Sequence, residues 1–147
     1  MDKVIIERNW ISNFLQFDHP LKYQGMVFHT VEHFYQAMKS HSLDYRQKVA
    51  LASTPGAAKR LGKKVELRSD WHDIKVDVML YALTYKFAPD TTWGKKLLKT
   101  SGSIVEWNYW HDNFWGNCRC NRCKNIHGEN WLGGLLMTIR TQLNQTT

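Results

Sequence analysis

The sequence predicts a mostly helical α+β domain with a few short strands, on three observations. Apolar residues recur with a helical period over several long stretches, whereas strand-like runs are short. Helix caps and stop signals separate these stretches, and the three prolines fall at predicted boundaries. With 147 residues, 43% of them hydrophobic, the chain can form one core and has little room for a second. We therefore expect a single compact domain over residues 1–147.

The predicted elements alternate short strands with helices. Strands are expected at residues 4–6, 21–23, 26–28 and 104–107, of which the middle two form a hairpin around Gln24-Gly25. Helices are expected at 30–39, 43–52, 55–62, 71–88, 92–99 and 130–143, and residues 112–116 form a turn or extended loop. Thr54, Pro55 and Gly62 mark the cap, first position and stop of the third helix.

Two of these helices carry more detailed expectations. The core face of the 71–88 helix should hold Trp71, Ile74, Val78, Ala82 and Tyr85. In the last helix, Gly133-Gly134 costs roughly 1 kcal/mol per residue against alanine, which indicates a close backbone approach by a ligand or a neighbouring segment.

The net charge and the cysteine content indicate which partners and which cellular compartment suit the protein. The formal net charge of +7 favours phosphate-bearing partners. The chain shows neither a signal peptide nor an apolar run long enough to span a membrane, and its three cysteines suit a reducing compartment. We expect a cytoplasmic monomer that does not bind membranes. The basic cluster of Lys59, Arg60, Lys63 and Lys64 is either a solvated helix end or an anion-attracting patch.

A polar stripe runs along the 30–39 helix. Thr30 is the expected N-cap, and Glu32, Gln36 and Lys39 share one face. Glu32 and Lys39 are roughly 10 Å apart along the helix, too far for an ion pair but suitable for gripping two parts of one ligand. A solvated helix face explains the stripe equally simply.

Acidic and aromatic residues elsewhere have both catalytic and structural interpretations. Cleavage of a glycosidic bond needs a carboxylate, which Glu32, Glu106 or Asp112 could supply, although each could instead be a cap or a surface acid. The tryptophans at 10, 71, 107, 110, 115 and 131 either stack on a base or pack in the core.

Three cysteines and a histidine lie within ten positions of one another. Cys118, Cys120, Cys123 and His127 are the residue types that hold tetrahedral zinc, and Cys-x-x-Cys is the usual knuckle spacing. The alternative is a basic loop with reduced thiols.

Many short motifs occur together in one order. They are Ser12-Asn13-Phe14, Thr30 to Lys39, Thr54-Pro55, Asp70-Trp71, Lys86-Phe87, Asp112-x-x-Trp115-Gly116 and Gly128-x-Asn130-x-Leu132-Gly133. Over nearly its whole length, the chain resembles the NADAR family, also called YbiA-like. The resemblance implies that family's fold and cleavage of the N-glycosidic bond of ribosylated, phosphate-bearing heterocycles, without a required cofactor.

The resemblance also assigns roles to individual residues. It places Glu32, Trp71 and Asp112 among the functional residues, and Lys39 joins them here as a candidate catalytic amine. The implied substrate-binding residues are Asn13, Phe14, Gln36, Lys86, Trp115, Gly116 and Asn130. Two departures stand out: a cysteine-rich segment replaces a glycine-rich one, and the stretch before Ser12 is short.

Three functions follow from these expectations. The first is removal of ADP-ribose from guanine in nucleotides, DNA or RNA, which the basic surface favours. The second is the same chemistry on a ribosylaminopyrimidine of riboflavin biosynthesis. The third is a non-catalytic module that binds ADP-ribose or nucleic acid through basic and aromatic groups, with or without a structural zinc knuckle.

Overall fold

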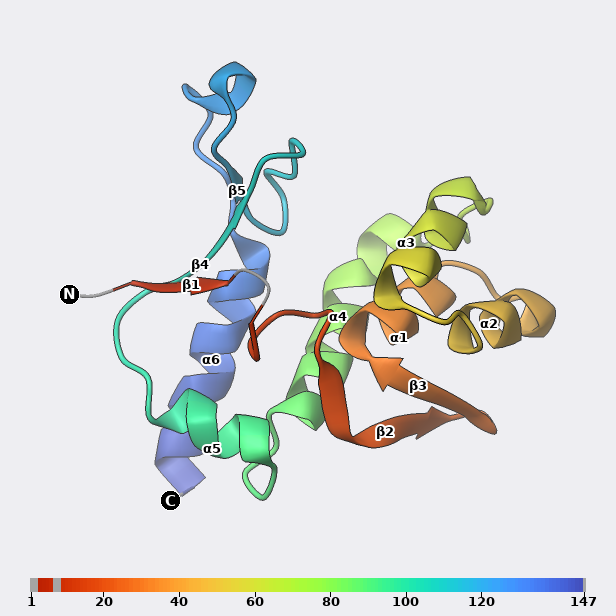
Figure 1. The fold of residues 1–147 in the computed structure, drawn as a ribbon, viewed down its shortest axis with the longest axis horizontal. Helices are drawn as coiled ribbons and strands as arrows, with labels where there is room; N and C mark the ends of the chain where they lie inside the picture. The colour runs from red at the N-terminus through yellow and green to blue at the C-terminus, as the bar shows by residue number, and fades with distance from the viewer. Residues whose placement is uncertain (1–2, 7–8, 147) are drawn as a thin grey trace. The chain divides into compact units, whose positions relative to one another are not determined.

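The computed structural model describes residues 3–6 and 9–146 (Figure 1). The chain divides into two compact units. The hairpin unit is Asn13–Lys86, and the sheet unit combines Met1–Ser12 with Phe87–Thr147. Among the described residues the structure has six α-helices and a few short strands, so the predicted mostly helical α+β class is confirmed.

The hairpin unit begins with two antiparallel strands, β2 (Gln16–Tyr23) and β3 (Met26–Thr30). Gln24 and Gly25 both have positive φ, 50° and 77°, as a two-residue hairpin turn requires. The register shifts between Gln16 and Leu21, so β2 extends beyond the predicted strand through an irregular stretch that contains Pro20.

Four helices complete the hairpin unit. They are α1 (Val31–Ala37), α2 (Leu43–Ala50), α3 (Pro55–Lys64) and α4 (Trp71–Lys86). Helix α1 follows β3 directly and contacts α2, α3 and α4 (Figure 1). Every residue of α1 is buried, because helices and the hairpin surround it. On its apolar side, Phe34 packs against the rings of Tyr23, Phe28 and Tyr81.

The sheet unit contains three parallel strands in the order β1 (Val4–Ile6), β4 (Ile104–Asn108) and β5 (Asn117–Cys118). Its helices are α5 (Thr92–Leu98), the short 3-10 helix η1 (Asn121–Cys123) and α6 (Trp131–Thr146). Helix α6 packs on β4 and buries Leu132, Leu136, Ile139 and Leu143. The helical period places Leu135 on the same face as well, but it is only half-buried.

The structure corrects two local expectations. Gly62 does not end α3, which continues to Lys64 with Gly62 buried inside it. In α4 the buried residues are Trp71, Met79, Ala82, Leu83 and Lys86, whereas the predicted face included Tyr85, which is 38% exposed. Helix α4 contacts both α1 and β2, so its buried residues are set by two neighbouring elements and do not follow the predicted apolar stripe. Of the helices that the structure describes, none has the length and apolar character needed to cross a membrane.

Asn130 joins the start of α6 to β4. Its side-chain Oδ1 accepts a hydrogen bond from Glu106 N at 2.9 Å, and its Nδ2 donates one to Ile104 O at 2.9 Å. The Asn130 amide therefore provides hydrogen-bond partners for backbone groups of β4, as a neighbouring strand would. The approach is close enough that a Cβ on Gly133 would collide with Ile104 O and Asn130, whereas a Cβ on Gly134 would meet no atom of the structure within 4 Å.

The neighbouring glycines give a matched pair of stability predictions. Gly133→Ala should lower the free energy of unfolding by about 1–3 kcal/mol, because α6 must move away from β4. Gly134→Ala should leave stability unchanged or raise it by up to about 1 kcal/mol, because alanine is the better helix former. Urea denaturation of both variants measures the difference. Equal effects of the two substitutions would contradict the close approach at Gly133.

Candidate active site

Glu32 and Gln36, the two residues of the polar stripe that lie in α1, are buried. Glu32 is only 7% exposed and Gln36 4%, which rules out the solvated helix face as the explanation of the stripe. The side chain of Gln36 donates a hydrogen bond from Nε2 to Glu32 Oε1 at 2.9 Å, one turn along the helix. Glu32 also lies in the first turn, where the helix dipole favours a negative charge. The structure thus holds a buried carboxylate in one orientation.

Two residues that contact Glu32, Asn13 and Gln36, each carry a buried acceptor atom. The backbone of Glu32 donates to Asn13 O at 3.2 Å, so Asn13 lies against the first turn of α1. Among the residues that the structure describes, neither Asn13 Oδ1 nor Gln36 Oε1 finds a hydrogen-bond donor, although both atoms are buried. Gln36 Oε1 reaches α3 at Gly62, where a Cβ would collide with it. Gly62 is therefore required for the Gln36 side chain to take this position.

Lys39 lies at the other end of the stripe, two residues beyond the last residue of α1, so the helix predicted over 30–39 ends earlier than expected. Its Nζ donates a hydrogen bond to Gly62 O at 3.4 Å and lies 5.8 Å from the centre of the Tyr35 ring. Burial of the amine lowers the pKa of Lys39, the Glu32 carboxylate opposes this shift, and Lys59, Lys63 and Lys75 lower the pKa further. Lys39 is therefore more easily deprotonated than an exposed lysine.

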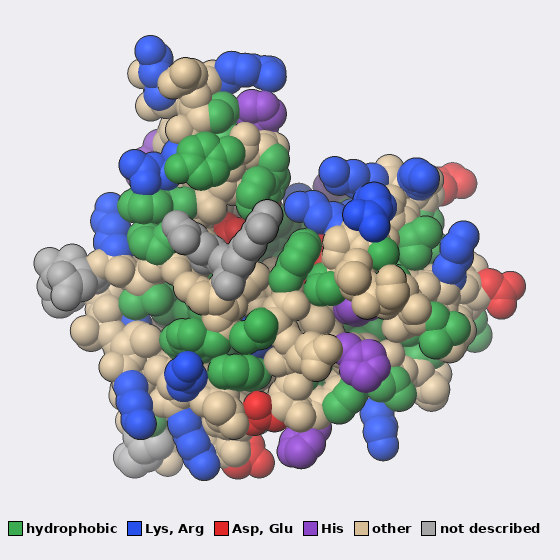
Figure 2. Space-filling view, in the orientation of Figure 1, with side chains coloured by type: hydrophobic (Ala, Val, Ile, Leu, Met, Phe, Trp, Pro, Cys, Tyr) green, Lys and Arg blue, Asp and Glu red, His purple; other side chains and the backbone are tan. Residues whose placement is uncertain are grey.

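Positive charge gathers over α3. Figure 2 shows Lys and Arg side chains clustered on this part of the hairpin unit. Helix α3 carries Lys59, Arg60, Lys63 and Lys64, and two of these lysines act electrostatically on Lys39. The field of the basic cluster thus extends to the polar stripe of α1, which favours the anion-attracting interpretation over a simple helix end.

Trp71 and Lys86 lie at the two ends of α4. Trp71 is buried, and its ring meets the edge of Tyr35 at a centroid distance of 5.0 Å. The start of α4 is fixed near the end of α1, because Arg68 N donates to Lys39 O at 2.8 Å and Trp71 N donates to Arg68 O. Lys86 is only 1% exposed, and burial of its amine lowers its pKa to about 7.

A cavity of about 190 Å³ adjoins the first turn of α1. Phe14, which the sequence predicted to bind substrate, lines it together with Gln16, His29, Thr30, His33, Ala52, Ser53 and Pro55. Glu32, Gln36 and Lys39 are not among the described residues that line this cavity. The cavity therefore adjoins a different face of α1 from the polar stripe.

His33 is a structural residue that sequence reasoning missed. Its Nε2 lies 3.0 Å from Ala52 O and its Nδ1 2.8 Å from Thr30 Oγ1. Nε2 donates to the Ala52 carbonyl, and in the neutral ring that burial favours, Nδ1 accepts from the Thr30 hydroxyl. Burial lowers the pKa of His33, and the backbone hydrogen bond to Ala52 partly opposes that shift. The imidazole thus ties the N-cap of α1 to the chain after α2.

The remaining predicted site residues belong to the sheet unit. Asp112 Oδ1 accepts hydrogen bonds from Phe114 N at 3.1 Å and Trp115 N at 2.9 Å, so this carboxylate organises its own loop. Asn108 supports the same loop by accepting from Asp112 N and donating to Asp112 O. A Cβ on Gly116 would collide with Glu106 O. Asn130, predicted to bind substrate, has both side-chain polar atoms bonded to β4.

The structure corrects one of the four predicted metal ligands. The group of potential metal ligands that the described residues form contains Cys118, Cys120, Cys123 and His111, but not His127. His127 lies four positions beyond Cys123 and is exposed. The sequence does contain a pattern that includes His111, namely His-x6-Cys-x-Cys-x2-Cys, in which the histidine precedes the cysteines instead of following them.

Comparison with known proteins identifies the family. The model of the NADAR domain matches residues 4–144 of the chain. The chain belongs to the NADAR domain family. The resemblance inferred from the sequence motifs is thereby confirmed.

Several relatives of this NADAR domain have names that state an activity or a biosynthetic pathway. The N-glycosidase YbiA of Escherichia coli is 34% identical over 134 residues, covering 90% of this chain and 79% of that protein. A chloroplastic riboflavin biosynthesis protein, PYRR, of Zea mays is 36% identical over 126 residues. The chain spans only 19% of that protein and 32% of a matching riboflavin biosynthesis protein of Vibrio vulnificus.

A solved structure supports the fold of this NADAR domain. The NMR structure of E. coli YbiA matches with a TM-score of 0.77 at 33% identity and covers 99% of this chain and 88% of that one. The predicted NADAR fold is therefore confirmed.

The buried amine of Lys86 gives a pH-dependent stability prediction for this NADAR domain. Its pKa is about 7 in the folded protein and about 10.4 when unfolded. The unfolded chain therefore binds more protons between these values, and the free energy of unfolding should rise as pH increases from about 7 to about 10. Urea denaturation at several pH values should show a shallower rise for Lys86→Met. The exposed Lys48→Met should keep the parent slope, and a parent-like slope in Lys86→Met would contradict the prediction.

Proposed function

We propose that this NADAR domain is an N-glycosidase that hydrolyses the bond between a ribose carbon and a heterocyclic nitrogen. Its substrate carries phosphate, and Glu32 is the catalytic carboxylate. The observation that carries the proposal is the buried Glu32 side chain, oriented by Gln36, with Lys39 just beyond the end of α1. The printed names of the YbiA relatives support the same reaction class.

The reaction needs a group that activates water near a developing positive charge. Glu32 accepts a proton from water as the water oxygen bonds to the ribose carbon, and its negative charge stabilises the oxocarbenium-like transition state. The carbon–nitrogen bond breaks, its electron pair stays on the heterocycle, and the nitrogen takes up a proton. No redox partner is required for this balance. Burial of Glu32 excludes competing water and strengthens its electrostatic effect.

Lys39 has a second role after the bond is cleaved. A released ribose opens to an aldehyde, and the neutral amine of Lys39 attacks that carbon to form an imine with loss of water. The lowered pKa of Lys39 supplies a larger fraction of the neutral amine. The alternative role is electrostatic: a protonated Lys39 binds a phosphate group together with the basic cluster on α3.

We infer that ADP-ribose attached to guanine is the preferred substrate. The basic cluster on α3 supports this choice, because a polyanion or a diphosphate gains more from several cations than a single phosphate does. The names of the maize and Vibrio relatives favour a second candidate, a ribosylaminopyrimidine intermediate of riboflavin biosynthesis. Incubation with each substrate and mass analysis of the released base separates the two candidates. Binding of both substrates without release of either base would instead indicate a binding module.

Replacement of the proposed base should abolish turnover without disturbing the fold. Glu32→Gln keeps the size and hydrogen-bonding capacity of the side chain but cannot accept a proton, so turnover should fall about 10²-fold or more. The matched control is Glu66→Gln, which changes an exposed carboxylate of the same unit. Both variants are assayed for base release and compared by thermal melting. Turnover above half the parent rate in Glu32→Gln would eliminate Glu32 as the catalytic group.

Borohydride trapping tests whether the amine of Lys39 forms an imine with the released ribose. If Lys39 forms an imine with the released ribose, borohydride added during turnover should leave a covalent ribosyl adduct on the parent protein but none on Lys39→Ala. Lys75→Ala serves as the control, because Lys75 influences Lys39 electrostatically but lies on α4. Peptide mapping locates the adduct. An adduct on Lys86, or none on the parent, would leave Lys39 with only an electrostatic role.

A further inference from the structure

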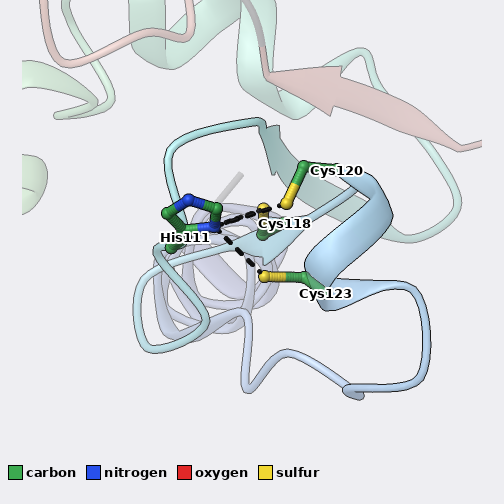
Figure 3. Close-up of side chains that lie close together, drawn as sticks. All are labelled: His111, Cys118, Cys120 and Cys123. Atoms are coloured by element: carbon green, nitrogen blue, oxygen red, sulfur yellow. Dashed lines mark hydrogen bonds between the residues drawn. The ribbon is translucent and has the colours of Figure 1, made fainter.

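Four potential metal ligands come together in the sheet unit. His111 lies in the loop after β4, Cys118 ends β5, Cys120 is the N-cap of the 3-10 helix η1, and Cys123 is its last residue (Figure 3). One ligand atom from each of these residues lies within 4.8 Å of every other. Neither the N-glycosidase names of the relatives nor the proposed catalytic residues account for this cluster.

We propose that His111, Cys118, Cys120 and Cys123 bind one zinc ion in a structural site. Tetrahedral zinc has bonds of about 2.3 Å to sulfur and about 2.0–2.1 Å to nitrogen, which places nitrogen and sulfur ligands about 3.6 Å apart. His111 Nδ1 lies 3.3 Å from Cys120 Sγ, 3.5 Å from Cys123 Sγ and 3.9 Å from Cys118 Sγ. These three distances bracket the tetrahedral value.

The ligand types favour zinc over other metals. Three thiolates and one imidazole form a soft, four-ligand set, whereas calcium and magnesium prefer oxygen ligands. A set of four protein ligands leaves no open position, which is typical of a structural rather than a catalytic zinc site. The backbone of η1 brings Cys120 and Cys123 to the same point, because Cys123 N donates to Cys120 O at 3.0 Å.

The surrounding residues orient the ligands. Asn113 accepts from Cys118 N at 2.9 Å through Oδ1 and donates to Cys123 Sγ at 3.5 Å through Nδ2, so one amide binds the backbone of one ligand residue and the thiol of another. His111 has a positive φ of 71°, an uncommon conformation for a non-glycine residue. Metal ligands often need such supporting contacts and such local strain to point at one centre.

Two arginines and a lysine supply positive charge close to the proposed site in the sequence. Three thiolates and one zinc ion carry a net charge of −1, which Arg119, Arg122 and Lys124 of the same segment offset. Arg122 Nη1 lies 3.3 Å from His111 Nε2. Zinc on Nδ1 leaves a proton on Nε2, so Arg122, which is exposed, must turn away when zinc binds.

Zinc would stabilise the loop that carries Asp112. His111 directly precedes Asp112, and the cysteines belong to β5 and η1, so the ion would tie two segments of the sheet unit together. The cysteine-rich segment would then stabilise a loop of the family motif Asp112-x-x-Trp115-Gly116 without taking part in bond cleavage.

X-ray absorption at the zinc edge tests the site directly. Full-length protein purified with zinc available should contain about one zinc per chain, with three sulfurs at about 2.3 Å and one nitrogen at about 2.0–2.1 Å. His111→Ala should lose the nitrogen and bind zinc at least 10-fold more weakly. His127→Ala is the matched control and should retain the parent spectrum and affinity. Asn113→Ala should keep all four ligands but weaken zinc binding by about 10–100-fold.

Several outcomes would overturn the proposal. Parent protein that holds iron, or no metal while its thiols are fully reduced, excludes the zinc site. A disulfide that forms among the three cysteines in the presence of zinc identifies a redox cluster instead. Loss of the nitrogen in His127→Ala but not in His111→Ala excludes His111 as the ligand. Because the parent spectrum alone decides the ligand set, the test does not depend on the variants folding.

Discussion

The hydrogen bond from Gln36 to the buried carboxylate of Glu32 sets the main constraint on the hairpin unit. A carboxylate removed from water is costly unless polar groups of the protein or a ligand compensate it. Gln36 supplies one such group, and its own position requires Gly62, since any larger residue in α3 would displace the amide. The arrangement of α1 against α3 is thus tied to the geometry of one polar side chain. Such a constraint, in which packing of two helices depends on a buried polar side chain, is expected where an active site lies within the protein core.

The sheet unit satisfies its backbone in a different way. Its strands are short, so asparagine side chains replace the partners that longer strands would provide. Asn108, Asn113 and Asn130 each bond to backbone groups of β4, β5 or the loop between them. The loop 108–118 is therefore held by side-chain amides, and a zinc ion at His111 and the three cysteines would add a further link.

Electrostatics connect the proposed site to its substrate class. The basic cluster on α3 lies close enough to lower the pKa of Lys39, while Glu32 opposes that effect. One carboxylate among several cations suits a reaction in which phosphate binds to the cations and positive charge develops at a sugar carbon. A site that only bound anions would gain nothing from a buried carboxylate.

The sequence by itself determined the mostly helical class, the position of nearly every helix and the family, because these depend on local periodicity, caps and motif order. It identified Glu32, Gln36 and Lys39 as one stripe, since residues three, four and seven apart share a helix face. Only the tertiary structure decided that Glu32 and Gln36 of this stripe are buried, that Gly62 continues α3 beneath Gln36, and that Asn130 is bonded to β4. It also placed His111, rather than His127, with the cysteines. These features depend on contacts between segments distant in the chain, which local sequence patterns do not encode.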